Sequence, residues 1–429
     1  MAADRAAGDF TFVHAADLHL DTPLKGLSEA APAVAAALRD ASLKAFEALV
    51  ELAVSEGAAF LCLAGDIYDG AERGLRAQLA FRDGLARLSA AGISTFIVHG
   101  NHDPVDEGWA AVSSWPERVH FFSSAAVEAI EVRRGDDVLA TVQGISYARR
   151  ETTENLALGF KARAGGGLQV GLLHCNVAGA ADGYAAYSPC TLEELRTVGL
   201  DYWALGHIHQ TLVLSGRPGG LEPWVVYPGN LQARSRKASE AGPKGAMVVT
   251  VRQGRVAALR HVACDQVRFV QAEIDASSCA DLAELHSALS EEGQRLLESA
   301  GGRSLVVRAR LVGRSAAHRE LAREGTLAEL TAALREEHQQ TEPFCWWDRV
   351  EDRTLPELDL EALAAGDDFT ADLLAVAGSF EASLPLPDLL GKMPAELRRA
   401  ALSLLEERGL PEILGRSSLL ALDRLEVSP

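Results

Sequence analysis

The chain has 429 residues, 48% of them hydrophobic and 24% charged, and its 41 basic and 60 acidic residues give a net charge of −19. These values suggest two or three domains with a large core and exclude a globally disordered chain. No apolar run reaches the roughly 18 residues of a membrane span, and the first ten residues lack the apolar stretch of a signal peptide. The six cysteines form no C-x-x-C pair, so we expect reduced thiols in a cytoplasmic protein, without a zinc or disulfide framework.

The first 260 residues alternate short apolar runs with longer segments that have leucine and alanine at helical spacing. Strands are predicted at 10–14, 60–64 and 95–99, separated by helices at 33–54 and 74–91. This alternation is typical of βαβ units and a parallel sheet. Further strands are expected in five segments: 139–143, 169–174, 202–205, 225–227 and 246–251. The last two flank a turn-rich stretch, which favours a hairpin between them.

Beyond this region the pattern changes. A strand, a helix and a strand are predicted in turn, which makes a small βαβ-like unit at 267–311. The rest of the chain is mostly helical, with a helix at 327–339, a strand at 344–350 and helices near 360–380 and 394–408. We therefore divide the chain into a domain at 1–264, an α+β domain at 265–350 and an acidic helical segment at 351–429.

Charge is unevenly distributed along the chain. Residues 351–429 hold 7 basic and 16 acidic residues, which is nearly half of the net excess. Residues 217–264, by contrast, hold eight basic residues and two acidic ones. A net acidic chain is a poor general nucleic-acid binder, because phosphate contacts come from Lys and Arg. The basic segment is either a phosphate-facing surface or a solvated hairpin, and composition favours neither.

Five short polar clusters follow predicted strands: Asp17-Leu18-His19, Gly65-Asp66-Ile67-Tyr68-Asp69, Gly100-Asn101-His102-Asp103, His174 and Gly206-His207-Ile208-His209. In open α/β sheets, sites form at the carboxyl ends of strands, where side chains from different strands converge. Asp, Asn and His are ligands typical of a pair of divalent transition metals. Each cluster alone has a structural explanation, such as a turn glycine or a buried core histidine. Five clusters in this order favour a metal site.

The order D-x-H, G-D-x-x-D, G-N-H-D, H and G-H-x-H resembles the calcineurin-like metallophosphoesterase superfamily. Three longer segments, at 12–21, 204–209 and 227–231, resemble the SbcD-type DNA repair exonucleases and, among these, the YhaO-type branch most. The resemblance covers residues 10–262, and beyond 265 it rests on a βαβ-like texture similar to the capping domain of those nucleases. It implies an α/β fold, an αββα sandwich of two mixed sheets, with the site at one rim and a smaller C-terminal α+β capping-like domain.

The resemblance also implies two divalent metal ions, usually manganese and sometimes iron or zinc. It assigns three residues to each ion and one bridge: Asp17, His19 and His209 for the first ion, Asn101, His174 and His207 for the second, and Asp66 between them. Because His207 and His209 are two residues apart, their assignment to different ions requires a turn after Gly206. Two ions about 3.5–4 Å apart lower the pKa of a shared water and clamp the phosphate oxygens of an in-line displacement.

His102 is the expected catalytic residue. It follows a ligand and is placed to protonate the leaving oxygen or to contact a non-bridging one. Asp69 resembles the family carboxylate that orients this histidine, although a role as N-cap of the next helix explains it as well. Candidate contacts to the substrate phosphates come from the basic segment: Arg234, Arg236 and Lys237.

Three functions are compatible with these motifs. The leading one is a two-metal-dependent phosphodiesterase that acts on DNA as an exonuclease or end-processing nuclease in repair. A small-molecule phosphoesterase, for example for cyclic nucleotides, uses the same chemistry and suits a net charge of −19 better. A non-catalytic scaffold is disfavoured, because such proteins usually lose liganding residues. No G-x-S-x-G and no P-loop occur, so neither a serine nucleophile nor an ATPase site is predicted.

The missing P-loop agrees with the division of labour in the family, whose nucleases usually work with a coiled-coil ATPase. The resemblance therefore implies an SbcC/YhaN-like ATPase partner, and segment 351–429 is either its docking site or a solvated helical cap. It also implies a homodimer, which in the family pairs through helices near the front of the catalytic domain, here 74–91. No membrane association is expected.

Overall fold

The computed structural model describes residues 8–22, 32–70, 74–106, 111–112, 114–163, 167–338, 342–358, 363–367, 369–383 and 386–426. The chain divides into two compact units. The first comprises residues 1–270, 297–306 and 339–346, and the second comprises residues 271–296, 307–338 and 347–429. The division at 264 and 350 inferred above differs from this one and stays a prediction.

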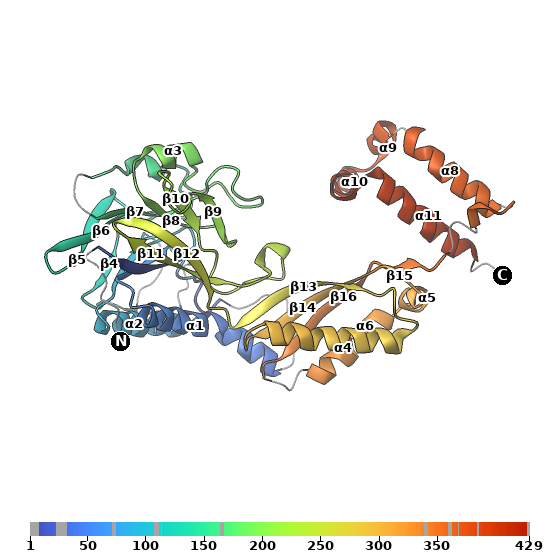
Figure 1. Ribbon diagram of the computed structural model, residues 1–429, viewed down its shortest axis with the longest axis horizontal. Helices are drawn as coiled ribbons and strands as arrows, with labels where there is room; N and C mark the ends of the chain where they lie inside the picture. Colours follow the sequence, from blue (N-terminus) through green and yellow to red (C-terminus); the bar gives the residue numbers. More distant parts are fainter. Residues whose placement is uncertain are drawn as a thin grey trace. The chain divides into compact units, whose positions relative to one another are not determined.

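Two six-stranded sheets form the first unit (Figure 1). The first sheet has the order β12-β11-β1-β2-β3-β4, with β1 (Phe10–Ala15), β2 (Phe60–Ala64), β3 (Ser94–Val98), β4 (Val119–Phe121), β11 (Gly245–Arg252) and β12 (Arg255–Ala263). The second has the order β5-β6-β7-β8-β10-β9, with β5 (Glu128–Arg134), β6 (Asp137–Gly144), β7 (Leu168–His174), β8 (Tyr202–Gly206), β9 (Leu212–Ser215) and β10 (Trp224–Tyr227). Both sheets are mixed, because parallel central strands meet antiparallel ones at the edges.

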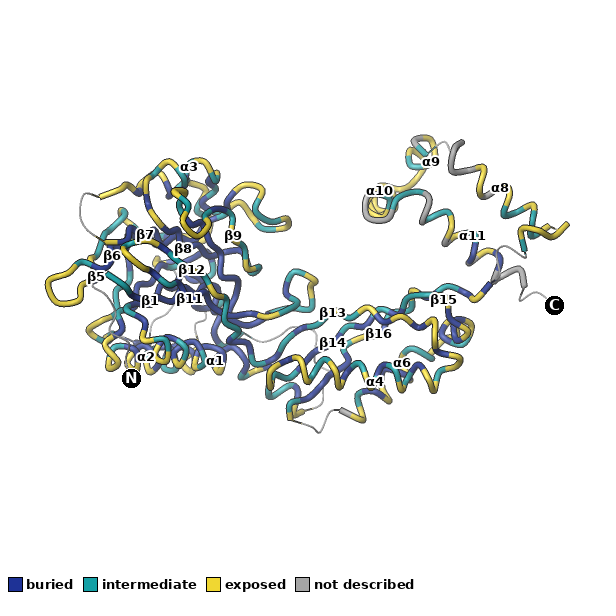
Figure 2. The backbone as a smooth tube through the Cα atoms, viewed as in Figure 1, coloured by how far each residue is buried: buried dark blue, intermediate teal, exposed yellow. Residues whose placement is uncertain are grey.

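Helices cover the outer faces of both sheets, and Figure 1 shows α1 (Pro32–Ser55) and α2 (Leu75–Ala90) on one side and α3 (Leu192–Thr197) on the other. Three apolar clusters fill the layers. Phe46 and Phe81 pack α1 and α2 on the first sheet, Phe12 stacks on Phe60 between the sheets, and Trp203 lies under α3. The central strands are accordingly buried, whereas the edge strands β5 and β12 are partly exposed (Figure 2). The predicted αββα sandwich of two mixed sheets is confirmed.

One predicted pairing in this unit is wrong. We expected a hairpin between 225–227 and 246–251, but β10 lies between β8 and β9 in the second sheet, whereas β11 lies between β1 and β12 in the first. Both strands are buried almost throughout, and a buried apolar run does not show which sheet it joins. The intervening stretch, with the 3₁₀ turn η2 (Ala238–Glu240), therefore crosses between the sheets; another 3₁₀ turn, η1 (Leu156–Gly159), precedes β7.

A three-stranded sheet follows in the chain, with β13 (Val267–Asp275), β14 (Ser304–Val312), β16 (Cys345–Asp352) and the helices α4 (Leu282–Ser299), α5 (His318–Leu321) and α6 (Thr326–His338). The backbone N–H of Ala276 donates to the carbonyl of Val312 at 2.9 Å, so β13 and β14 end at the same edge. With α4 between them they form the predicted βαβ unit. A short pair, β15 (Arg314–Ser315) and β17 (Leu355–Pro356), lies nearby in the chain.

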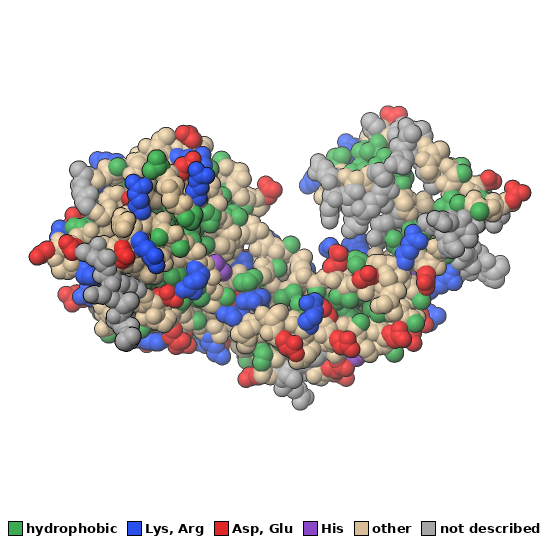
Figure 3. Space-filling view, viewed as in Figure 1, with side chains coloured by type: hydrophobic (Ala, Val, Ile, Leu, Met, Phe, Trp, Pro, Cys, Tyr) green, Lys and Arg blue, Asp and Glu red, His purple; other side chains and the backbone are tan. Residues whose placement is uncertain are grey.

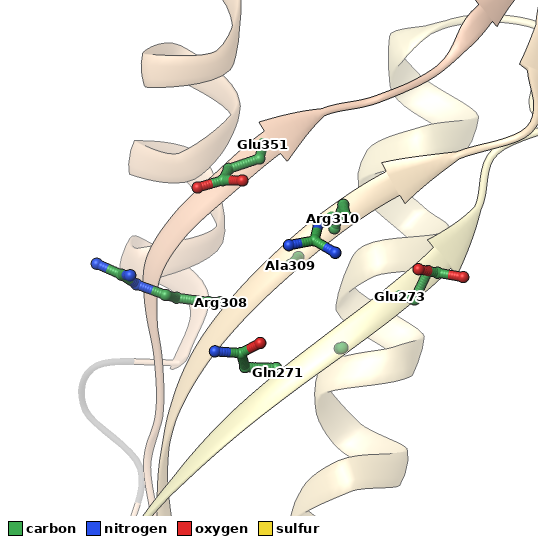
Figure 4. Close-up of a pocket in the computed structure, with 7 residues that line it drawn as sticks. Gln271, Glu273, Arg308, Ala309, Arg310 and Glu351 are labelled. Carbon is green, nitrogen blue, oxygen red and sulfur yellow. The ribbon is translucent and has the colours of Figure 1, made fainter. Parts of the chain in front are cut away.

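The second unit has a polar sheet face, drawn in Figure 4. Along β14, Val307, Ala309 and Leu311 are buried, whereas the alternate residues Arg308 and Arg310 are partly exposed. These two arginines lie on the middle strand between acidic side chains of the flanking strands: Glu273 and Glu351 (Figure 4). Alternation of buried apolar and exposed charged residues is typical of a sheet with one solvated face.

Four helices end the second unit: α8 (Phe369–Ser383), α9 (Leu386–Lys392), α10 (Ala395–Arg408) and α11 (Leu410–Glu426). The predicted helix at 394–408 matches α10, and part of the one near 360–380 lies outside the described residues. Several large apolar side chains are exposed here: Phe369, Val376, Leu389, Met393, Leu397, Leu402 and Leu404. Among the described residues, no helix has the length and apolar character that crossing a membrane requires.

Candidate metal centre

Polar side chains converge at one rim of the sandwich, where strands of both sheets end. Asp17, Asp66 and Asn101 follow β1, β2 and β3 of the first sheet, whereas His174 ends β7 and His207 follows β8 of the second. Parallel neighbours end at the same edge of a sheet, so packing the two sheets face to face brings the five positions together.

The backbone at this rim is strained. Four non-glycine residues have positive φ angles: Asp17 (53°), His19 (44°), Asp66 (52°) and His207 (104°). Such conformations cost about 1–3 kcal/mol each and cluster at functional sites. Loop-to-loop hydrogen bonds hold two of them, because the N–H of Asp17 donates to Gly65 and that of His19 donates to Asp66. The backbone is thus bent so that these side chains point into the rim.

Two glycines permit the close approach of the strand ends. A Cβ atom at Gly100 would meet the side chains of Asp66 and His174, and one at Gly206 would meet the carbonyl oxygen of Ala64. Any larger residue at either position would therefore displace a neighbour. These contacts explain the first residue of two of the three predicted clusters that begin with glycine.

Two groups of these side chains have Asp17 in common, and Asp66 belongs to the second of them. The donor atoms of Asp17, His19 and His209 lie within 4.8 Å of one another, as do those of Asp17, Asp66 and His174. Asp66 Oδ2 lies 3.7 Å from Nε2 of His19 and 3.5 Å from Nε2 of His174. Oxygen and nitrogen donors at this spacing fit divalent transition metals.

The histidines form two pairs around this carboxylate. The ring centroids of His19 and His209 are 5.3 Å apart, and those of His174 and His207 are 5.2 Å apart. Asn101 joins the second pair, since its Oδ1 lies 3.0 Å from His174 Nε2. The structure thus brings the seven predicted ligands together at one rim, and their division between two ions stays a prediction. The chain bends after β8, with the positive φ angle of His207, and this places His207 and His209 in different pairs.

Hydrogen bonds orient three of the four rings. His174 Nδ1 contacts the Ala64 carbonyl at 2.8 Å, His207 Nε2 the Ala185 carbonyl at 2.9 Å, and His209 Nδ1 the Glu240 carboxylate at 2.7 Å. Each acceptor holds the proton on that nitrogen and leaves the other nitrogen without a proton, as in metal-binding histidines. His19 Nδ1 is buried and has no hydrogen-bond partner among the described residues. A buried imidazole nitrogen without a hydrogen-bond partner fits a site for a cation.

Burial controls the charge of the ligands. It lowers the pKa of His174 and of His207 to about 4, and that of His19 well below its usual value, an effect that Arg234 reinforces. These imidazoles are therefore neutral, the form that binds metals. Burial also raises the pKa of Asp66 to about 6. Divalent cations stabilise ionised carboxylates, so the donor set fits two such ions.

His102 and Asp69 lie beside the first histidine pair. Asp69 Oδ1 is 2.5 Å from His102 Nδ1, and Asp69 Oδ2 is 2.5 Å from the Arg234 guanidinium. Burial lowers the pKa of His102, but the Asp69 hydrogen bond and the charge of Asp66 raise it by more. Asp69 does not cap the next helix, because α2 begins at Leu75 with Gly74 as its N-cap. The contact with His102 thus agrees with the first of the two interpretations drawn from the sequence, whereas α2 is capped elsewhere.

A cleft of about 610 Å³ opens over this rim. Of the three candidate phosphate contacts, Arg234 and Lys237 line it, whereas Arg236 does not. Several lining residues escaped the sequence analysis: Arg150, Asp182, Tyr184, Tyr187 and Glu240. Asp182, Tyr184 and Tyr187 belong to the loop after β7, where no motif marks them. The Tyr184 hydroxyl accepts a hydrogen bond from the N–H of His209 at 3.1 Å, so this loop forms one wall of the site.

Comparisons with known proteins identify the family of the chain. A family model described as calcineurin-like phosphoesterase matches residues 10–211, and one described as metallophosphoesterase YhaO, middle domain, matches residues 269–355. The uncharacterized metallophosphoesterase YhaO of Bacillus subtilis is 36% identical over 355 residues, which cover 83% of this chain and 84% of that protein. A crystal structure of a dimetal phosphatase from Danio rerio matches 59% of this chain and 96% of its own, at 14% identity and a TM-score of 0.37. The chain belongs to the calcineurin-like metallophosphoesterases and, within them, to the YhaO-type family.

Proposed function

We propose that this protein is a two-metal-dependent phosphodiesterase that acts on DNA as an exonuclease or end-processing nuclease in repair. The observation that carries the proposal is the gathering of two ligand sets around the buried Asp66, beside the paired His102 and Asp69. The step from phosphoesterase to nuclease rests on the SbcD-type segments of the sequence.

In the proposed site each ion has three residues of its own and shares Asp66: Asp17, His19 and His209 hold one ion, and Asn101, His174 and His207 hold the other. Bound manganese ions would supply Lewis acidity to the phosphate and lower the pKa of water. His102 donates a proton to the leaving oxygen, and Asp69 keeps its ring in place. Since Asp69 also anchors Arg234, that guanidinium is positioned to contact a phosphate oxygen in the cleft.

The charge of the cleft bears on the substrate. Arg150, Arg234 and the exposed Lys237 supply positive charge to the cleft, whereas Asp182 is acidic. Basic and acidic side chains are interspersed over the face of the first unit seen in Figure 3. DNA binding then depends on a few basic side chains near the proposed metal ions. The net charge of −19 supports a second candidate, a small phosphodiester such as a cyclic nucleotide.

Partners are part of the proposal. The exposed apolar residues of α8, α9 and α10 support docking of a coiled-coil ATPase of the SbcC/YhaN type on this segment. A homodimer through α2 has weaker support, because half of the exposed residues of this helix are charged: Arg76, Asp83 and Arg87.

A paired hydrolysis assay tests the proposal. The manganese-loaded protein is given end-labelled duplex and single-stranded DNA in one arm, and bis-p-nitrophenyl phosphate and cyclic nucleotides in the other. Progressive shortening of DNA that the Asp66→Asn variant lacks supports the nuclease. Turnover of the small diesters with intact DNA would replace it by the second candidate, and no turnover in either arm would refute the phosphodiesterase.

A further inference from the structure

A buried carboxylate holds the second nitrogen of His209. Glu240 is 5% exposed, and its Oε1 lies 2.7 Å from His209 Nδ1. Its other oxygen, Oε2, accepts from Asn230 Nδ2 at 2.8 Å and from the backbone N–H of Arg234 at 3.2 Å. Both oxygens of Glu240 are thus occupied by donors, which leaves the carboxylate a single orientation.

The same turn also holds the backbone of His209. Lys244 is almost fully buried, and its ammonium donates to the carbonyl of His209 at 2.7 Å and to that of Ser239 at 3.3 Å. The segment 239–244 therefore fixes both the main chain and the ring of one candidate ligand. A solvated turn does not need buried charged contacts of this kind in order to fold.

Asn230 connects this network to the first strand. It lies in the Y-P-G-N-L segment, to which the proposed chemistry assigns no role, and it is completely buried. It pairs with Ala16, next to Asp17, in an isolated bridge, and its side chain also donates to the carbonyl of Gln232. Asn230 is thus placed between the Asp17 end of β1 and Glu240.

We propose that Glu240, oriented by Asn230, is a positioning residue that keeps the proton of His209 on Nδ1 and leaves Nε2 free for the ion shared with Asp17 and His19. The inference rests on the proposed two-metal site. An acceptor behind a histidine ligand fixes both its tautomer and its ring orientation. The other ion, held by the set around His174, does not depend on this contact, because His174 and His207 are oriented by backbone carbonyls.

The substitution Glu240→Gln tests this arrangement with almost no change in shape. If the amide oxygen faces His209, its NH₂ group meets the donors of Asn230 and Arg234. If the amide is turned, the NH₂ group faces His209 and favours the tautomer with the proton on Nε2, and that nitrogen then has no lone pair for the ion. Either orientation weakens one ion site and leaves the other intact.

The readout is the free manganese signal in electron paramagnetic resonance during titration of the metal-free protein. We expect two ions in the wild type, and in Glu240→Gln an affinity about 10–100-fold lower for one ion only. Asn230→Ala, which keeps the carboxylate, changes the same site in the same direction and carries the test if Glu240→Gln does not fold. Glu128→Gln is the matched control, because Glu128 contacts His120 Nε2 at 3.1 Å on β4 and β5, outside the residues that line the cleft, and should change neither affinity.

Two results would overturn the positioning role. One is wild-type affinity for both ions in Glu240→Gln and Asn230→Ala. The other is an equal loss at both sites with a lower melting temperature of the metal-free protein, which marks a merely structural residue. If the wild type binds no manganese at all, the proposed two-metal function fails instead, so the two failures are distinguishable.

Discussion

Replacing Asp69 by asparagine should separate proton transfer from metal binding. Asp69 holds both His102 Nδ1 and the Arg234 guanidinium at 2.5 Å, yet it belongs to neither of the ligand sets that enclose Asp66. We therefore expect Asp69→Asn to fold and to bind two ions. Its defect should lie in the proton that His102 delivers.

The size of the effect follows from the contact that is lost. A hydrogen bond to a charged group contributes about 1.5–3 kcal/mol. Since each 1.36 kcal/mol corresponds to tenfold in rate, kcat/KM should fall by about 10- to 150-fold. KM should rise as well, because Arg234 loses its anchor.

The pH dependence gives the sharper readout. The Asp69 hydrogen bond contributes to the raised pKa of His102, so the protonated, proton-donating form persists to higher pH in the wild type. Without the carboxylate this pKa falls, and the alkaline limb of the rate profile should move to lower pH. The assay is hydrolysis of the best substrate over a pH series, with bound manganese measured in parallel.

The control is Asp83→Asn, which removes the same charge from an exposed pair with Arg82 on α2 and should leave the profile unchanged. An Asp69→Asn variant with wild-type rate and profile would show that His102 is not oriented by this carboxylate. Loss of a bound ion would instead identify Asp69 as a ligand, since its carboxylate also lies within 4.8 Å of donor atoms of His19 and His102.

Three further outcomes are expected. Asp66→Asn should abolish hydrolysis and reduce the bound manganese below two ions while the circular dichroism stays native; full activity would remove the shared bridge. Lys237→Glu should weaken DNA binding and flatten the slope of log K against log salt by about one unit, measured by anisotropy; an unchanged slope would mean that the exposed Lys237 contacts no phosphate. Gly206→Ala should lower the free energy of unfolding by about 1–3 kcal/mol in urea, because its Cβ would meet the Ala64 carbonyl, whereas Gly378→Ala, with open space around it, should not destabilise the protein.

The spacing of apolar residues along the sequence correctly predicted the helices α1 and α2 and the strand ends that carry the polar clusters. The helical spacing at 33–54 and 74–91 gave the limits of α1 and α2 to within one residue, and the polar clusters were correctly expected at strand ends. The pairing of β10 and β11 was beyond such reasoning, because both are buried apolar runs and only the packing of the two sheets decides their partners.

The site shows the same division. The motif residues were identified by their spacing, but Glu240 counted only as one acidic residue within a basic segment, and its contact with His209 exists only in the folded turn. The basic segment also has residues in two different settings. Arg234 lies in the cleft, whereas Arg260 lies on the β11–β12 hairpin and pairs with Glu56 at the surface. The solvated-hairpin interpretation thus holds for Arg260, whereas a phosphate contact of Arg234 stays a prediction.

Because the ligands come from both sheets, assembly of the site has an order. The first part of the chain to be synthesised carries Asp17, His19, Asp66 and Asn101, and the histidines at the ends of β7 and β8 follow later. The first sheet itself is complete only when β11, which lies beyond β8 in the sequence, has inserted beside β1. Until the two sheets have packed together, the nascent chain therefore holds only part of the predicted ligand set. We therefore expect the proposed ions to bind only after the two sheets have packed together, and to link the sheets once they are bound.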